Sequence, residues 1–120
     1  MDDERIRELF EGLGPVSIRR MFSGKGIYHN DLIIGIDLGG EVLLKADAVS
    51  APAFEAAGCR QWLYTHRTSG KPVAMPYWSV PDAALDDPEE MARWARTAYE
   101  AALRAPRQAP AKVRRGGRSA

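Results

Sequence analysis

Four short runs rich in β-branched and aromatic residues follow one another with only two to four residues between them, and this spacing restricts the fold more than any other feature. The runs cover residues 17–22, 27–29, 32–38 and 41–45, and the breaks are Gly24-Lys25-Gly26, Asn30-Asp31 and Gly39-Gly40. Parallel neighbours need a crossover of about a dozen residues, so loops this short join antiparallel strands. The first part of the chain is therefore predicted to form an antiparallel meander.

Two further runs, residues 61–66 and 71–80, follow a short helix between Ser50 and Gly58. Pro76 lies inside the second run, and because proline has no N–H it belongs on an edge strand or at a bulge. In the run 32–38, strict alternation places Leu32, Ile34, Ile36 and Leu38 on one face and Asp37 on the other. The pattern predicts about six strands in total.

A helix is predicted at each end of this sheet. Asp2 or Asp3 caps the first helix, and Asp87, followed by Pro88, caps the last. Apolar residues at helical spacing mark the buried stripes, namely Ile6, Leu9, Phe10 and Leu13 in the first and Met91, Trp94, Ala95, Ala98 and Ala102 in the last. The predicted order is α-β-β-β-β-α-β-β-α, an α+β fold with both terminal helices on one face of the sheet.

Charge divides the chain into two parts. Of the 17 basic residues six lie from Arg104 onward, where there is no acid, so the preceding residues carry 11 basic and all 16 acidic side chains. We expect a folded domain over 1–104 and a disordered basic tail over 105–120, because the tail has too little apolar surface to offset the entropy of ordering. Its basic residues would contact nucleic acid or merely aid solubility; they are Arg107, Lys112, Arg114, Arg115 and Arg118.

The compartment is expected to be the cytoplasm. The single cysteine, Cys59, cannot form an intramolecular disulfide, which fits a reducing environment. No apolar stretch approaches the roughly 20 residues that span a bilayer, and the acidic start of the chain does not resemble an export signal. We therefore expect no membrane association.

No pattern in the sequence supports catalysis. Gly24-Lys25-Gly26 matches neither a dinucleotide fingerprint nor a P-loop and is interpreted as a turn with one glycine at positive φ. His29, His66 and Cys59 lack the spacing of metal ligands or of a nucleophile and its base. Asp86-Asp87 is explained by helix capping. We expect no catalytic residue, no metal and no cofactor.

Aromatic residues gather on the last two predicted strands. Trp62, Tyr64, Tyr77 and Trp78 lie there, close to several cationic residues. Such combinations grip protein partners or stack bases; the alternative is that at least Tyr64 and Tyr77 fill the core. The candidate interaction surface comprises Arg19, Arg20, Trp62, Arg67, Lys71 and Trp78.

Four motifs, met in order along the chain, resemble the N-terminal domain of the TfoX/Sxy family of bacterial competence regulators. They are residues 20–28 (RMFSGKGIY), 43–47 (LLKAD), 54–58 (FEAAG) and 70–81 (GKPVAMPYWSVP), and Ser23 stands where the family usually has glycine. The resemblance implies a small α+β domain, and its better-known members assist the cyclic-AMP receptor protein at competence promoters. Those members carry a second, helical domain, whereas only the basic tail follows here.

The resemblance and the absence of a catalytic pattern together suggest a non-enzymatic interaction module, with a protein partner in transcription or competence regulation. The alternative is an accessory protein that binds nucleic acid nonspecifically through its tail. An unpaired edge strand could support a dimer, but Pro76 would protect such an edge as readily as expose it, and a monomer is expected rather than a dimer.

Overall fold

The computed structural model describes residues 1–21 and 24–106 and confirms the α+β prediction. The elements are α1 (Asp3–Leu9), β1 (Ser17–Met21), β2 (Gly24–His29), β3 (Leu32–Leu38), β4 (Glu41–Lys45), α2 (Ala51–Ala56), β5 (Gln61–Thr65), β6 (Pro72–Ser79), α3 (Asp82–Leu85) and α4 (Pro88–Arg104). Only the single-turn helix α3 was not expected from the sequence.

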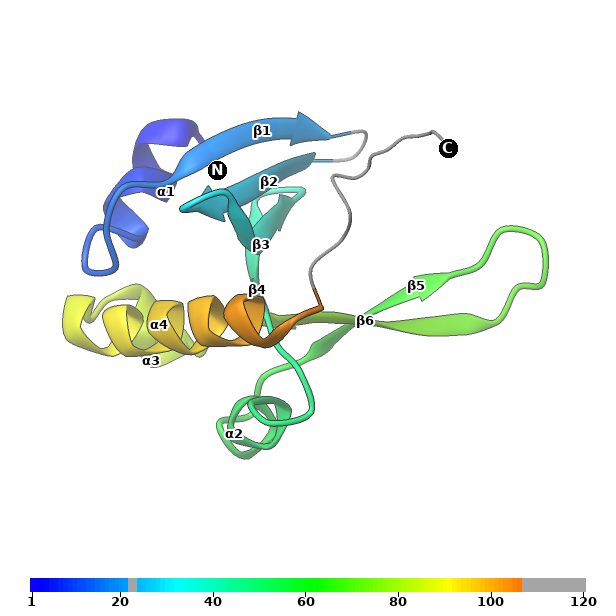
Figure 1. The fold of residues 1–120 in the computed structure, drawn as a ribbon. Helices are drawn as coiled ribbons and strands as arrows, with labels where there is room; N and C mark the ends of the chain where they lie inside the picture. Colours follow the sequence, from blue (N-terminus) through cyan, green and yellow to red (C-terminus); the bar gives the residue numbers. More distant parts are fainter. Residues whose placement is uncertain (22–23, 107–120) are drawn as a thin grey trace.

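The six strands form one antiparallel sheet in the order β1-β2-β3-β4-β6-β5. The first four make the predicted meander. Its turns at Asn30-Asp31 (φ 51° and 67°) and Gly39-Gly40 (φ 59° and 93°) have the positive φ that tight hairpins require. The β5–β6 hairpin joins this meander through β6 and then extends away from the rest of the molecule (Figure 1).

The interpretation of Gly24-Lys25-Gly26 as a turn is wrong, because β2 already begins at Gly24 and neither glycine has a positive φ. Close packing explains the first glycine instead. A Cβ atom on Gly24 would lie 1.9 Å from the carbonyl oxygen of Asp37 on β3, so no other residue fits without moving the backbone.

A β-bulge in β3 overturns the predicted face of that strand. Ile27 lies opposite Gly35 and Tyr28 opposite Ile33, so Ile34 is an extra residue on β3. A bulge interrupts the alternation of side chains. Ile34 accordingly packs under the helices, whereas Ile36 packs on the other face.

The same bulge turns Asp37 toward the helices, opposite Val42 of β4. Asp37 is 4% exposed, and its Oδ2 accepts a hydrogen bond of 3.2 Å from the amino group of Met1. A buried carboxylate requires such a charged partner. Asp37 therefore has a structural role: it binds the N-terminal amino group, just before α1, to strand β3.

Pro76 lies at a bulge, one of the two places the sequence allowed, but on the inner strand β6. The register between β5 and β6 shifts between the pairs Gln61–Trp78 and Leu63–Ala74. The side-chain amide of Gln61 donates a 3.0 Å hydrogen bond to the carbonyl of Met75 across this irregularity. The edge strand β5, in contrast, contains no proline.

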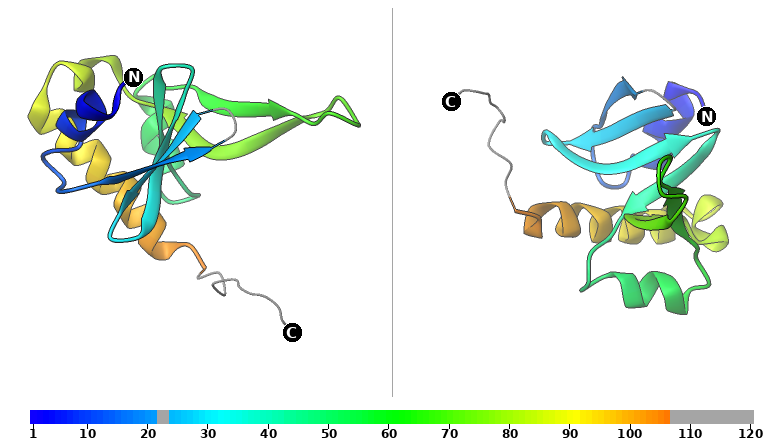
Figure 2. Two further views of the ribbon diagram at one scale, coloured as in Figure 1. Left: turned by 90° about the horizontal axis from the view of Figure 1, so that it is seen from above. Right: turned by 90° about the vertical axis from the view of Figure 1, so that its right-hand side faces the viewer.

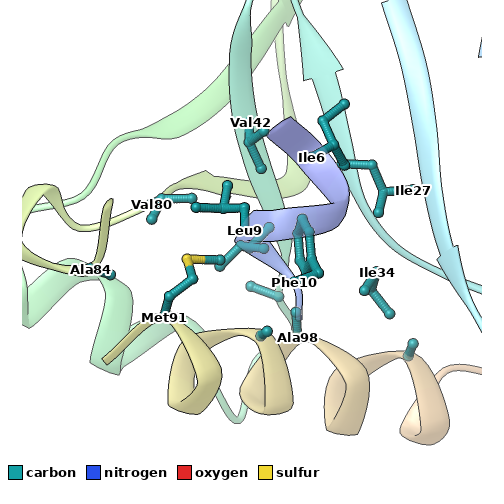
Figure 3. Close-up of a cluster of buried hydrophobic side chains, with 14 of the residues drawn as sticks. Ile6, Leu9, Phe10, Ile27, Ile34, Val42, Val80, Ala84, Met91 and Ala98 are labelled. Carbon is teal, nitrogen blue, oxygen red and sulfur yellow. The ribbon is translucent and has the colours of Figure 1, made fainter. Parts of the chain in front are cut away.

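The main core lies between the sheet and the helices. Figure 3 shows Leu9 of α1 and Phe10, which directly follows α1, between strand residues such as Val42 and residues of α4 such as Met91. Phe54 of α2 belongs to the same cluster and is fully buried, with its ring 4.7 Å from that of Trp94. All four helices contribute side chains to this one cluster.

Polar contacts fix both ends of α4. Asp87 caps the N-terminus as predicted, its Oδ1 accepting from the backbone N–H groups of Glu89 and Glu90 at 3.1 and 3.3 Å. At the other end Arg104 donates two hydrogen bonds, of 2.7 and 3.0 Å, to the carboxylate of Asp47 in the loop after β4. This pair joins the end of α4 to the sheet.

Candidate interaction surface

The face of the sheet that points away from the helices carries its own apolar cluster, called here the open face. Its buried members are Ile36, Leu43 and Tyr77, and the partly buried ones are Ile33, Leu38, Trp62 and Met75. Every one of these residues comes from a strand, and in the described part of the chain no helix contributes to the cluster. The open face is thus formed by strands alone.

The β5–β6 hairpin, called here the arm, projects beyond the rest of the sheet (Figure 2). Leu63 is 59% exposed, Tyr64 46% and Val73 42%, and Tyr64 lies directly opposite Val73 in the hairpin. The ring of Trp62 contacts those of both Tyr64 and Tyr77, each with a centroid separation of 6.4 Å. Trp62 therefore links the exposed arm to the buried cluster.

Cations surround this aromatic surface. The Arg19 guanidinium lies 4.3 Å from the ring centroid of Tyr28, and the Lys45 ammonium lies 5.7 Å from that of Tyr77. Burial, with a smaller contribution from Tyr28, raises the pKa of the Tyr77 hydroxyl, so this group stays neutral at physiological pH. From residue 60 to residue 81 the sequence has no acidic residue.

The structure divides the six residues proposed from the sequence. Arg19 and Trp62 lie on the open face, and Arg67 and Lys71 are exposed at and beside the arm's loop. The other two, Arg20 and Trp78, do not lie on this surface. Four of the six thus belong to one continuous surface.

Arg20 and Trp78 lie on the helix side of the sheet. Arg20 is opposite Lys25, whose ammonium donates to the carboxylate of Asp3 at the start of α1. Trp78 is partly buried, with its ring stacked on Phe54 at 6.2 Å. Side chains alternate between the two faces along β1 and β6. Arg20 and Trp78 therefore lie on the opposite face from Arg19 and Tyr77, which precede them in the sequence.

Tyr64 and Val73 lie on the open-face side of the arm although they were not among the six proposed residues, whereas Leu63, opposite Ala74, lies on the other side of the arm. The expectation that Tyr64 and Tyr77 both fill the core is right for Tyr77 and wrong for Tyr64. An apolar residue in a short strand gives no sign that the strand extends beyond the helices. The sequence signal that distinguishes the arm is the lack of acidic residues from residue 60 to residue 81.

A cleft of about 600 Å³ lies on the helix side, between α2, α3 and the ends of β4 and β6, with Cys59, Arg60, Ser79, Asp82 and Trp94 in its lining. Burial raises the pKa of the Cys59 thiol, and nearby Asp82 acts in the same direction. A thiol that stays protonated at neutral pH is a poor nucleophile.

The two histidines take part in local hydrogen bonds. His29 Nδ1 lies 2.7 Å from the carbonyl oxygen of Pro15, and its ring packs edge-on against Tyr99 at 4.9 Å. His66 Nδ1 accepts from the backbone N–H of Ser69 in the arm's loop. Within residues 1–21 and 24–106 no group of three or more His, Cys, Asp or Glu residues is placed to hold a metal ion.

The five basic residues proposed to bind nucleic acid lie outside the described residues; they are Arg107, Lys112, Arg114, Arg115 and Arg118. In the part of the chain that the structure covers, no helix combines the length and the apolarity needed to cross a bilayer.

The family model described as the TfoX N-terminal domain matches residues 8–102. This span runs from α1 to α4 and so includes the whole sheet, the open face and the arm. No curated protein matches the chain.

Proposed function

The chain belongs to the TfoX N-terminal domain family, and from this premise we propose that it is a non-enzymatic interaction module that presents its open face and arm to a protein of the transcription apparatus. The observation that carries this proposal is the exposure of apolar side chains on the arm. Tyr64 and Val73 lie opposite each other on the open-face side of one projecting hairpin, Leu63 lies on its other side, and none of the three belongs to the cluster under the helices.

The energetics favour a binding role for these residues. Burying apolar surface contributes roughly 25 cal/mol per Å², and aromatic residues next to an apolar cluster are frequent hot spots of protein interfaces. Trp62 is already held by its contact with Tyr77, so little of its conformational freedom remains to be lost on binding. A partner that covers Tyr64 and Val73 would extend the cluster of the open face.

The charge of the arm indicates the chemistry of the partner. Arg67 and Lys71 are exposed and no acidic residue lies between them in the sequence, whereas Arg60, just before β5, is paired with Glu41 at 2.6 Å. A partner patch that combines apolar side chains with carboxylates would match this surface, and the cations would chiefly speed association. The rate of association is then expected to fall with rising salt.

Affinity capture from native cell lysate tests this proposal. Wild-type bait should retain a transcription-associated protein that the variant Tyr64→Ala loses. Val49→Ala is the matched control, because Val49 is an exposed apolar residue, at 70%, in the turn before α2, outside the open face and arm. Equal recovery by the Tyr64 variant, or no transcription-associated protein under any growth condition, would argue against the proposal.

Nonspecific binding of nucleic acid through the tail is the second candidate function. It is supported by the sequence, which places five basic residues and no acid after residue 106. Five phosphate contacts would give a log-log salt slope of about −4.5. Arg104 is left out of this number because it is paired with Asp47.

A gel-shift experiment with duplex DNA at low salt tests this candidate. The intact chain should shift the DNA, and a chain ending at Pro106 should not. Retention of the full shift by the shortened chain would refute a role for the tail.

A further inference from the structure

The two edges of the sheet differ in how well they are protected against pairing with another strand. β1, at one edge, carries Arg19 and Arg20 at adjacent positions, and charged side chains discourage edge-to-edge association. β5, at the other edge, has the sequence QWLYT, with no charge and no proline. The proline expected to protect an edge, Pro76, lies on the inner strand β6. The reason to expect a monomer is therefore removed.

The hydrogen-bond pattern of the arm shows which groups of β5 remain open. The N–H of His66 donates to the carbonyl of Lys71 at 2.9 Å, and the carbonyl of His66 accepts from the N–H of Gly70 at 2.8 Å, so both backbone groups of His66 are bonded within the hairpin. Bonded and non-bonded pairs alternate along an antiparallel ladder. The next pair, Thr65 with Pro72, is then non-bonded, which suits a proline, and so is Leu63 with Ala74.

The backbone N–H and C=O groups of Leu63 and Thr65 consequently point away from β6. They form the free edge of the sheet, since β5 is its terminal strand. These backbone groups of β5 are held in extended conformation, so they are already aligned to form hydrogen bonds with an added strand.

We propose that two copies of this chain associate through β5, antiparallel to each other about a two-fold axis at Leu63. In this register Leu63 faces Leu63 of the second copy in a bonded pair, and Gln61 faces Thr65. Trp62 then lies opposite Tyr64 of the second copy in a non-bonded pair, the kind in which side chains approach most closely.

The sequence of β5 suits a partner identical to itself. An uncharged strand meets no like charge across the two-fold axis, and each Trp62 gains a second tyrosine beside the one it already contacts at 6.4 Å. Leu63, 59% exposed in the single chain, becomes covered by its counterpart. The arm projects away from the helices, so two arms can meet without the bodies overlapping (Figure 1).

Each strand contributes only five residues, and an interface of this size falls at the weak end of specific associations. We therefore expect a reversible monomer–dimer equilibrium and not an obligate dimer. The dimer joins two open faces into one continuous sheet. This inference does not rest on the proposed function, because it concerns the purified chain alone.

Sedimentation of the purified full chain tests the association. The average mass should rise from one chain toward two between about 10 μM and 1 mM, the range of weak interfaces. Leu63→Lys should weaken the dimer at least about tenfold, because two ammonium groups would face each other at the axis. Val49→Lys is the matched control, since Val49 is 70% exposed and lies outside the arm. A constant mass of one chain, or an unchanged equilibrium in Leu63→Lys, would overturn the proposal.

Crosslinking tests the register in a Cys59→Ser background. Leu63→Cys should crosslink through a short bifunctional thiol reagent, because residues in a bonded pair have Cα atoms about 5.5 Å apart. Thr65→Cys is the control, as the two copies of that residue would be roughly 14 Å apart. Equal crosslinking at both positions would contradict pairing about Leu63.

Discussion

The two faces of this sheet are made from the same strands but differ in what covers them. On the helix side, Phe10 and Phe54 are completely buried, and side chains from all four helices pack around them. On the open face the cluster is smaller and passes directly into an arm whose Leu63 and Tyr64 are largely exposed. One face therefore holds the chain together, while the other leaves part of its apolar surface exposed to solvent.

The largest effect on stability is expected from Phe54→Ala. Phe54 is fully buried between Trp78 and Trp94, so removing its ring leaves a cavity and should cost about 3–5 kcal/mol of unfolding free energy. Urea denaturation followed by tryptophan fluorescence measures the change. A loss of less than about 1 kcal/mol would mean that the helix side is not the main source of stability.

An intermediate, pH-dependent effect is expected from Asp47→Asn. The guanidinium of Arg104, aided by hydrogen bonds from Ser50, holds the pKa of Asp47 well below its usual value of 3.8. A carboxyl whose pKa is lowered by folding stabilises the protein above its unfolded pKa, and this contribution disappears as the pH falls through the folded value. The pair is partly exposed to solvent, so the loss at pH 7 should be about 1 kcal/mol.

Denaturation of the wild type and of Asp47→Asn at pH 7 and below pH 3.8 measures this dependence. The difference between the two should shrink in acid. Glu11→Gln is the matched control for loss of one carboxylate, because Glu11 is exposed on the surface. A difference that stays constant with pH would assign the effect to packing and not to the ion pair.

The smallest effect on stability is expected from Tyr64→Ala. Tyr64 is 46% exposed, and substitutions at such positions usually change the unfolding free energy by no more than about 0.5 kcal/mol. The same denaturation assay measures it. A loss above about 2 kcal/mol would show that the arm supports the fold, and the contrast between the two faces would no longer hold.

Local signals in the sequence were enough to predict most elements. Short loops gave the antiparallel meander, and Asp87 followed by Pro88 gave the start of α4. The prediction of which β3 side chains share a face was wrong, because it assumed that the alternation of side chains runs through the whole strand without interruption. Gly35 was the available signal, since a lone glycine inside a strand often marks a bulge or close contact, and a Cβ there would lie 2.8 Å from the carbonyl oxygen of Leu43.

The candidate surface was only partly predictable. Arg19 and Trp62 were assigned to a surface from their residue types, and they do lie on the open face. The exposure of Tyr64 depends on how far the arm projects beyond the helices, which is set by tertiary packing. Local sequence carries no information about that length.

The bulge at Ile34 shifts the alternation of side chains by one residue between the two ends of β3. Deleting this one residue would restore strict alternation within β3. Either end of the strand would then have to exchange its two faces, so that Asp37 would lose the amino group of Met1 or Leu32 would turn away from the helices. The strand should therefore tolerate apolar substitutions of similar size at Ile34 far better than the loss of that position.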